Sequence, residues 1–415
     1  MQQVAMSWLV YRLTGSALLL GLIGCAGSLP MLLLAPLAGV ISDRCNRQRL
    51  VCVTQSLAMG QAFLLAALAF ANVIAVWQLV LLSACLGIIS IFDMTARQSF
   101  LLEMVPDRED LANAIALNST LVNSARLLGP ALAGLTIALT SEATCFLLNG
   151  VSYIAVLIAL VAMKVPLQPR RSTTPFRKGL AEGVSYAFHF TPIRSILVML
   201  AFVSFAGIPY GVLLPEFVSG ILHRDADTLG FLSAAAGVGA LLAAVYLAAR
   251  KNLKGMGIEL TANCVLLAAA LTLFALVHRL DVALVSSVVV GFTQMVLTAG
   301  GNTVLHTIVD EDKRGRVMSF YMMAVLGVSP AGCLATGVSA DWIGGPLTVL
   351  AGGPICLVAA YRFARRLPRL RQEAIIVMRR RAIPPANQNE PKESRPSVNF
   401  LVIQPQEPAT WSDAA

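Results

Sequence analysis

The sequence predicts an all-α membrane protein in which two bundles of six helices stand side by side. Of its 415 residues, 57% are hydrophobic and 13% are charged, which is too apolar to cover the surface of a soluble domain. Uncharged runs long enough to cross a bilayer recur along the chain, and a short pattern in the first half returns in the second. Composition, run length and repetition therefore agree on one fold class.

The apolar runs define the helices. A hydrocarbon core about 30 Å thick needs roughly 20 apolar residues of α-helix to cross it. Eleven runs reach that length, near 17–41, 50–72, 75–96, 112–139, 143–163, 195–218, 228–249, 257–277, 281–301, 316–340 and 344–364.

The stretch before the first run is apolar but short. Only about 11 residues precede Arg12, too few to cross a membrane alone. We interpret residues 1–13 as the outer half of a first transmembrane helix whose beginning is missing from this chain. A short interfacial segment is the alternative.

The charges predict an orientation, because Lys and Arg accumulate in short cytoplasmic loops. With the loop at 42–49 placed in the cytoplasm, only Arg12, Arg224 and Arg279 among the 31 Lys and Arg residues fall on the opposite side. We expect a multi-pass protein with a cytoplasmic C-terminus. Its net charge of +9 then reflects this orientation and an attraction to anionic membrane lipids, and it requires no nucleic-acid partner.

The longest connection divides the chain into two halves. Within it, Phe176, Leu180, Val184 and Phe188 recur every four residues, which predicts an amphipathic helix on the inner membrane surface. The expected units are an N-terminal bundle at 1–164, a cytoplasmic linker at 165–192, a C-terminal bundle at 193–364, and a basic and then disordered tail at 365–415.

The two halves echo each other in one loop. QSFLLEMVPDREDLANA at 98–114 and NTVLHTIVDEDKRGRVM at 302–318 share a polar end of a span, a valine, a charged cluster and the start of the next span. Two units in the same orientation are typical of parallel repeats, for which a binding site is expected between them near mid-membrane.

A charged loop interrupts the apolar runs at GVISDRCNRQR, residues 39–49. Its Gly39, Asp43, Arg44, Arg47 and Arg49, placed between the second and third helices, resemble the signature loop of the major facilitator superfamily. LPMLLLAPLAGVISDR, FDMTARQSFLLEMVP and ARLLGPALAG are similar to bacterial exporters that include the enterobactin (siderophore) exporter and macrolide efflux proteins. The resemblance covers residues 1 to about 365, and implies the major facilitator fold and a bacterial inner membrane.

The resemblance implies that this loop is a conformational latch, which fastens the two halves on the cytoplasmic side when the cavity opens outward. Gly39 permits a neighbouring helix to approach, and Asp43 can accept hydrogen bonds from the free N–H groups of a helix beginning near 316. An ordinary positive-inside loop explains the arginines but not the spacing of Gly39 and Asp43. The matching stretch at 249–257 keeps the bases and lacks the aspartate.

Arg126 is the costliest residue to place, because a guanidinium at the centre of a membrane helix costs about 2.5 to 3.5 kcal/mol on insertion scales. Ser119, Asn123, Arg126 and Pro130 share one helix face, which we expect to line the bundle interior or a watery cavity. One interpretation is a contact with substrate, or a proton-linked switch with a carboxylate such as Asp93. The other is a structural arginine bonded to backbone carbonyls.

A helix break is expected beside it. Gly129, Pro130 and Gly134 lie in ARLLGPALAG, which resembles, incompletely, the Gly-Pro motif of superfamily antiporters. The resemblance implies export rather than import.

Further polar positions give candidates for the translocation path and for proton coupling. Gln294 and Thr298 line one face of a helix, either along the path or in a hydrogen-bonded seam between helices. Asp93, expected near the inner end of the fourth helix, and Glu216, near an outer end, are candidate proton carriers. Met318, Met322 and Met323 suit an adaptable apolar wall or simple packing.

No phosphate-cradling GxxxxGK[ST] loop occurs, so an ion gradient is the expected driving force. We predict a secondary transporter that exports a siderophore-, macrolide- or drug-like amphiphile by proton antiport. The alternative is a transport-inactive protein of the same fold, receptor-like or a truncated copy. The four scattered histidines give no catalytic or metal-binding spacing, so we expect neither an enzyme nor a cofactor.

Overall fold

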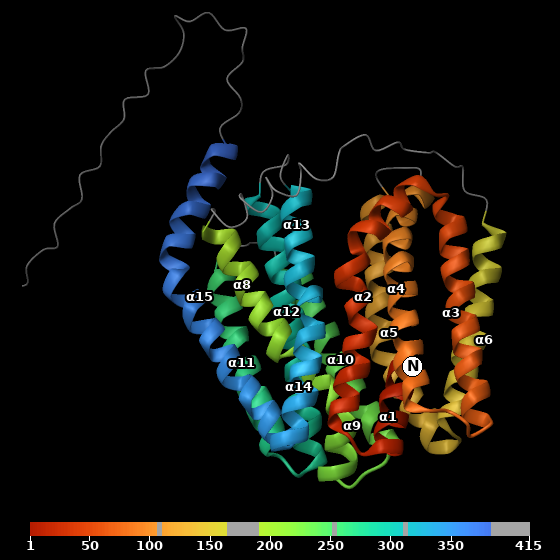
Figure 1. Cartoon of the computed structure of the whole chain (residues 1–415). Helices are drawn as coiled ribbons and strands as arrows, with labels where there is room; N and C mark the ends of the chain where they lie inside the picture. The colour runs from red at the N-terminus through yellow and green to blue at the C-terminus, as the bar shows by residue number, and fades with distance from the viewer. Residues whose placement is uncertain (106–109, 164–190, 251–254, 310–313, 383–415) are drawn as a thin grey trace, which may run out of the picture.

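The computed structural model describes residues 1–105, 110–163, 191–250, 255–309 and 314–382 (Figure 1). The expected amphipathic helix of the linker and the tail beyond 382 lie outside the described residues. Within the described ranges, eleven helices are long and apolar enough to cross a membrane, which confirms the expected fold class.

Helices of the first half form the N-terminal bundle. They are α1 (Gln2–Thr14), α2 (Ala17–Arg44), α3 (Arg47–Phe70), α4 (Val76–Met104), α5 (Leu111–Leu139) and α6 (Glu142–Ala162).

The C-terminal bundle contains shorter pieces as well as long helices. They are α8 (Thr191–Ala206), η1 (Ile208–Val212), α9 (Leu214–Glu216), η2 (Phe217–Ile221), α10 (Ala226–Ala249), α11 (Met256–Leu276), α12 (Leu280–Ile308), α13 (Arg314–Met322), η3 (Met323–Gly327), α14 (Ser329–Ile343) and α15 (Gly345–Ala382).

The two bundles repeat one packing scheme. In the N-terminal bundle α2 packs on α4 and α3 on α6, and in the C-terminal bundle α10 packs on α12 and α11 on α15. Helices α4 and α12 each have 29 residues and end at the extended Val105 and Val309, the two valines of the sequence echo. The echo therefore marks equivalent positions of two parallel repeats.

The helix ends define two faces of the molecule. We call the end where α2 finishes at Arg44 and α13 begins the basic end, which lies at the top of Figure 1. The opposite end holds the turn from α1 to α2 and the start of α15.

Two helix pairs make the most extensive contacts between the bundles, α2 with α14 and α5 with α10. Their backbones approach closely because glycines face each other. A Cβ added to Gly134 would lie 2.6 Å from Cα of Gly230, and one added to Gly21 would lie 2.6 Å from the carbonyl oxygen of Cys333. Small residues permit this approach without any side chain between the helices.

Helix continuity differs from the sequence expectation in two ways. The break predicted at Gly129 and Pro130 is wrong, because α5 remains helical from Leu111 to Leu139. Breaks occur instead between α8 and η2, where Pro209 and Pro215 interrupt the backbone ladder, and between α13 and α14. α5 packs against α10 at this point, where the carbonyl oxygen of Pro130 lies close to Gly230.

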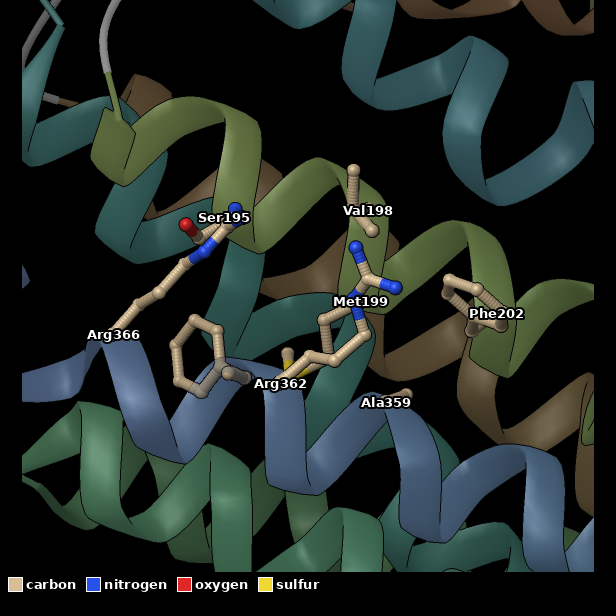
Figure 2. Close-up of a pocket in the computed structure, with 8 residues that line it drawn as sticks. Ser195, Val198, Met199, Phe202, Ala359, Arg362 and Arg366 are labelled. Atoms are coloured by element: carbon tan, nitrogen blue, oxygen red, sulfur yellow. The ribbon is translucent and has the colours of Figure 1, made fainter.

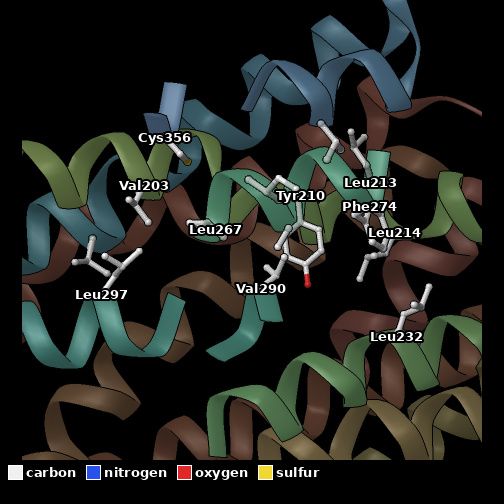
Figure 3. Close-up of a cluster of buried hydrophobic side chains, with 14 of the residues drawn as sticks. Val203, Tyr210, Leu213, Leu214, Leu232, Leu267, Phe274, Val290, Leu297 and Cys356 are labelled. Atoms are coloured by element: carbon white, nitrogen blue, oxygen red, sulfur yellow. The ribbon is translucent and has the colours of Figure 1, made fainter. Parts of the chain in front are cut away.

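The core of the C-terminal bundle fixes the broken segment. Figure 3 shows buried side chains from η1, α9, α11 and α12 meeting there. Tyr210 meets the ring of Phe274 edge-on, with 5.8 Å between the ring centroids. This aromatic contact anchors η1 where regular helix is lost.

Candidate functional site

A cavity of about 370 Å³ lies between the two bundles, in the half of the molecule nearer the basic end. Helices α2 and α4 form one wall, and α13 with η3 forms the other. The lining residues are Met31, Leu32, Ala35, Ile91, Met94, Thr95, Gln98, Ser319, Phe320, Met322, Met323, Leu326 and Gly327.

The cavity wall is mainly apolar and rich in methionine. The unbranched, polarisable methionine side chain adapts to guests of different shape. Gln98 is exposed, and within the described residues its amide forms no hydrogen bond. Such a wall suits an amphiphilic guest that one or two polar groups orient. Met322 and Met323 lie where the sequence hypothesis placed them, whereas Met318 does not line the cavity.

Close contacts between the bundles lie on one side of this cavity. The glycine contacts of α2 with α14 and of α5 with α10 seal the side towards the opposite end. At the basic end, a Cβ added to Gly39 would meet nothing within 4 Å. Among the described residues, the close helix approach expected at Gly39 is therefore not seen in this conformation.

The latch loop joins α2 to α3 tightly. Asn46 caps α3 by accepting a hydrogen bond from the backbone N–H of Arg49 at 3.1 Å. Arg47 donates to the carbonyl oxygen of Ser99 on α4, with 3.5 Å between the two atoms, and so contacts its own bundle. The side chains of Asp43 and Arg44 lie outside the described residues, so the contact of Asp43 with the helix near 316 stays a prediction.

Among the described carboxylates of the N-terminal bundle, Asp93 has the most partners. It accepts hydrogen bonds from Thr54 at 3.0 Å and Gln55 at 2.7 Å, and pairs with Arg97 at 2.9 Å. Its expected place near the helix end is wrong, since α4 continues to Met104. The i,i+4 pairing with Arg97 partly neutralises the charges and lets the helix extend.

Arg126 has neither the carboxylate nor the backbone-carbonyl partner expected for it among the described residues, and its contact with substrate stays a prediction. Its side chain is exposed, and within the described residues it forms no ion pair or hydrogen bond, while Asp93 pairs with Arg97 instead. The side chains of Ser119 and Asn123 on the same face lie outside what the structure describes.

Gln294 and Thr298 lie in a seam between helices and not on the cavity wall. Gln294 donates to the carbonyl oxygen of Gly207 at 2.7 Å, which satisfies a backbone group freed where α8 ends. Thr298 donates to the carbonyl oxygen of Gln294, and Tyr321 donates to that of Thr298 at 3.0 Å. In this conformation both residues therefore match the hydrogen-bonded seam between helices and not the translocation path.

Glu216 holds the opposite end together. Its carboxylate accepts a hydrogen bond from the N–H of Gly345 at 2.9 Å, at the first residue of α15. A carboxylate at a helix N-terminus is stabilised by the free N–H groups and the helix dipole. The contact ties α9 to α15.

A buried amide chain was missed by the sequence reasoning. Asn149 of α6 donates to Gln2 of α1 at 2.8 Å, Gln2 donates to Gln61 of α3, and Gln61 donates to the carbonyl oxygen of Leu82 on α4 at 3.2 Å. This chain connects four helices across the N-terminal bundle. The available signal was two amides inside apolar runs, but the partner helices are not readable from the sequence.

Two ion pairs were also missed. Arg12 of α1 meets Glu142 at the start of α6, with 3.1 Å between the atoms. Arg250 pairs with Glu259 between α10 and α11. Although the loop at 249–257 lacks the aspartate of the latch, an acid from the following helix contacts its base.

Comparison with known proteins identifies relatives along almost the whole chain. A family model described as transmembrane secretion effector matches residues 1–401. The staphyloferrin A transporter of Staphylococcus aureus is 25% identical over 388 residues, covering 89% of this chain and 94% of that protein. The multidrug efflux pump Tap of Mycolicibacterium fortuitum is 25% identical over 379 residues, covering 89% and 92%.

A solved structure shares the fold. It is a bacterial homologue of the human lysosomal transporter Spinster, in an inward-facing and unoccupied conformation, with a TM-score of 0.68 and 17% identity. The match covers 91% of this chain and 94% of that one. The relatives named here are transporters or pumps.

Proposed function

The chain belongs to the transmembrane secretion effector family of the major facilitator superfamily, and from this membership we propose that it is a secondary active exporter of an amphiphilic small molecule. Siderophore-, macrolide- and drug-like compounds are the proposed substrates. The names of the two relatives, a staphyloferrin A transporter and a multidrug efflux pump, support these classes.

The observation that carries the proposal is the methionine-rich cavity between the bundles. It offers about 370 Å³, within the size range of small-molecule sites, and has an apolar wall with few polar groups. The bundles meet closely towards the opposite end, whereas no described atom lies within 4 Å of a Cβ placed on Gly39. With the basic end in the cytoplasm of a bacterial inner membrane, this is the conformation that loads a substrate from inside.

Proton antiport is the proposed coupling, with Asp93 as the carrier. Asp93 precedes Met94 and Thr95, which line the cavity, so the proton site adjoins the substrate site. Protonation of Asp93 would remove the charge that holds Arg97, and the freed guanidinium would favour a different arrangement of α3 and α4. The latch loop at 39–49 then closes the basic end.

The test measures efflux from proteoliposomes with an imposed pH gradient, using ethidium as the drug-like probe and radiolabelled erythromycin as the macrolide. Asp93→Asn, Asp43→Asn and Arg126→Ala are compared with the wild type. Asp281→Asn is the matched control, because Asp281 pairs with Arg279 at the exposed surface of the opposite end.

We expect gradient-driven efflux by the wild type and the control, and loss of coupling in Asp93→Asn. Parental rates in Asp43→Asn and Arg126→Ala would overturn the latch and path assignments. A folded wild type that moves neither probe under any gradient would favour the transport-inactive alternative.

A further inference from the structure

A second, smaller cavity lies between α8 and α15 towards the basic end (Figure 2). Its enclosed volume is about 10 Å³, room for about one water molecule, and Arg362 beside it is exposed at the surface. The lining residues are Ser195, Val198, Met199, Phe202, Ala359, Arg362, Phe363 and Arg366. It shares no residue with the cavity between the bundles.

The cavity is strongly cationic. Arg362 and Arg366 are one helical turn apart on α15, and Figure 2 shows both side chains directed towards α8. The lining contains no acidic residue, and within the described part of the chain neither arginine forms an ion pair or hydrogen bond. Two guanidinium groups thus present donors on one helix face with no carboxylate in the lining to pair with them.

A neighbouring arginine behaves differently. Arg365 stacks on the ring of Tyr361, 4.7 Å from its centroid, and does not line the cavity. At the start of α8, Arg194 has a buried Nε for which the described residues supply no acceptor. The free donors therefore gather where α8 and α15 meet.

The depth of the cavity in the membrane distinguishes possible ligands. The apolar span of α15 runs from Gly345 to Pro368, so Arg362 and Arg366 lie in its last two turns, at headgroup level. Val198, Phe202 and Ala359 continue the wall towards the membrane centre. A cationic rim above an apolar wall matches a molecule with an anionic head and a hydrocarbon chain.

We propose that the surface beside this cavity, formed by Arg362 and Arg366 with Val198 and Phe202, binds an anionic phospholipid of the leaflet at the basic end. The phosphate lies between Arg362 and Arg366, because guanidinium groups bind phosphate oxygens in a bidentate manner. One acyl chain lies along Val198 and Phe202. A soluble phosphate would use the same arginines but gains nothing from the apolar wall.

The test is native mass spectrometry of the full chain in detergent, titrated with phosphatidylglycerol. The Arg362→Gln, Arg366→Gln double variant should bind this lipid at least about tenfold more weakly, since each arginine near a membrane surface contributes roughly 1 kcal/mol. Arg365→Gln, which removes the same charge from the same helix, should bind like the wild type. Phosphatidylcholine should bind weakly to all three.

Three outcomes would overturn the proposal. They are unchanged affinity in the double variant, an equal loss in Arg365→Gln, and displacement of the lipid by sn-glycerol 1-phosphate at matched concentration. A conservative pair, Arg362→Lys with Arg366→Lys, guards against misfolding because it keeps both charges. The affinity of this lysine pair for phosphatidylglycerol should lie between those of the wild type and the double glutamine variant. A loss as large as that of the glutamine pair would contradict the charge-based site.

Discussion

The two ends of the interface between the bundles differ in how closely the helices meet. Towards the opposite end, a Cβ on Gly134 would overlap the backbone at Gly230, and one on Gly21 would overlap Cys333. At the basic end, a Cβ on Gly39 would meet nothing within 4 Å. The same residue type thus serves as a contact at one end and faces open space at the other.

The difference shows how each end is controlled. Glycine contacts bring backbones together without charges, so the seal at the opposite end rests on shape. The basic end carries the charged loop at 39–49, whose contacts depend on distance and on ionic strength. A transporter needs one end closed while the other is free to move, and this conformation shows such an arrangement.

The largest effect on stability and efflux is expected from Gly134→Leu, which disrupts the close helix contact towards the opposite end. Because Gly230 offers only backbone at 2.6 Å, the helices must separate, with an expected loss of unfolding free energy of about 1 to 3 kcal/mol and efflux at background level. Thermal unfolding and proteoliposome efflux measure both. Gly60→Leu is the control, since a Cβ there meets nothing within 4 Å. Normal efflux in Gly134→Leu would contradict the seal.

Gly39→Leu tests the open end. The free energy of unfolding should stay within about 0.5 kcal/mol of the wild type, because no described atom lies within 4 Å of a Cβ placed on Gly39. If the latch must close against this site, overpacking should slow efflux about tenfold or more. Unchanged efflux would show that no helix approaches Gly39 during the cycle.

Met323→Ala probes the boundary between the two ends, where η3 lines the cavity. Shortening the side chain should weaken binding of a bulky amphiphile about threefold to tenfold, since each buried methylene is worth about 0.8 kcal/mol. KM values for ethidium and erythromycin give the readout. Met163→Ala, at the C-cap of α6, is the control, and an equal change there would argue against a substrate contact.

The smallest effect is expected from Gln294→Leu, which sharpens the distinction between seam and cavity. Loss of its hydrogen bond to Gly207 should reduce the free energy of unfolding by about 1 kcal/mol and leave substrate preference unchanged. Gln98→Leu should leave the free energy of unfolding unchanged and alter substrate preference, because Gln98 lines the cavity and has no partner among the described residues. A changed substrate preference in Gln294→Leu would indicate that Gln294 contacts the substrate along the translocation path.

Much of the fold was predictable, because a lipid environment forces apolar runs of fixed length. One exception is α4, predicted to end near 96 but continuing to Met104. The sequence placed Asp93 near the end of the helix and Arg97 in the following loop, whereas their i,i+4 pairing partly neutralises both charges within the helix. Likewise, Pro130 and Pro209 look equivalent in the sequence, and only tertiary packing decides that the first is tolerated and the second lies in a break.

The site was less predictable. Met322 and Met323 were named from composition, but Met31, Met94 and Gln98 require knowledge of which helices face each other across the interface. Arg126 attracted attention because its burial would be costly, yet its side chain is exposed and outside the cavity lining. A charged residue in an apolar run is visible in the sequence, whereas the lining of a cavity depends on how several helices pack together.

The paired glycine contacts also have a mechanical consequence. The bundles come into near contact at two points, Gly21 with Gly337 and Gly134 with Gly230. The line through these two points is a natural axis for rotation of one bundle against the other. From Gly21 to Arg44, α2 is a lever of roughly 35 Å at about 1.5 Å per residue. A tilt of about 10° over that length displaces the far tip by roughly 6 Å, so small rotations become ångström-scale gating.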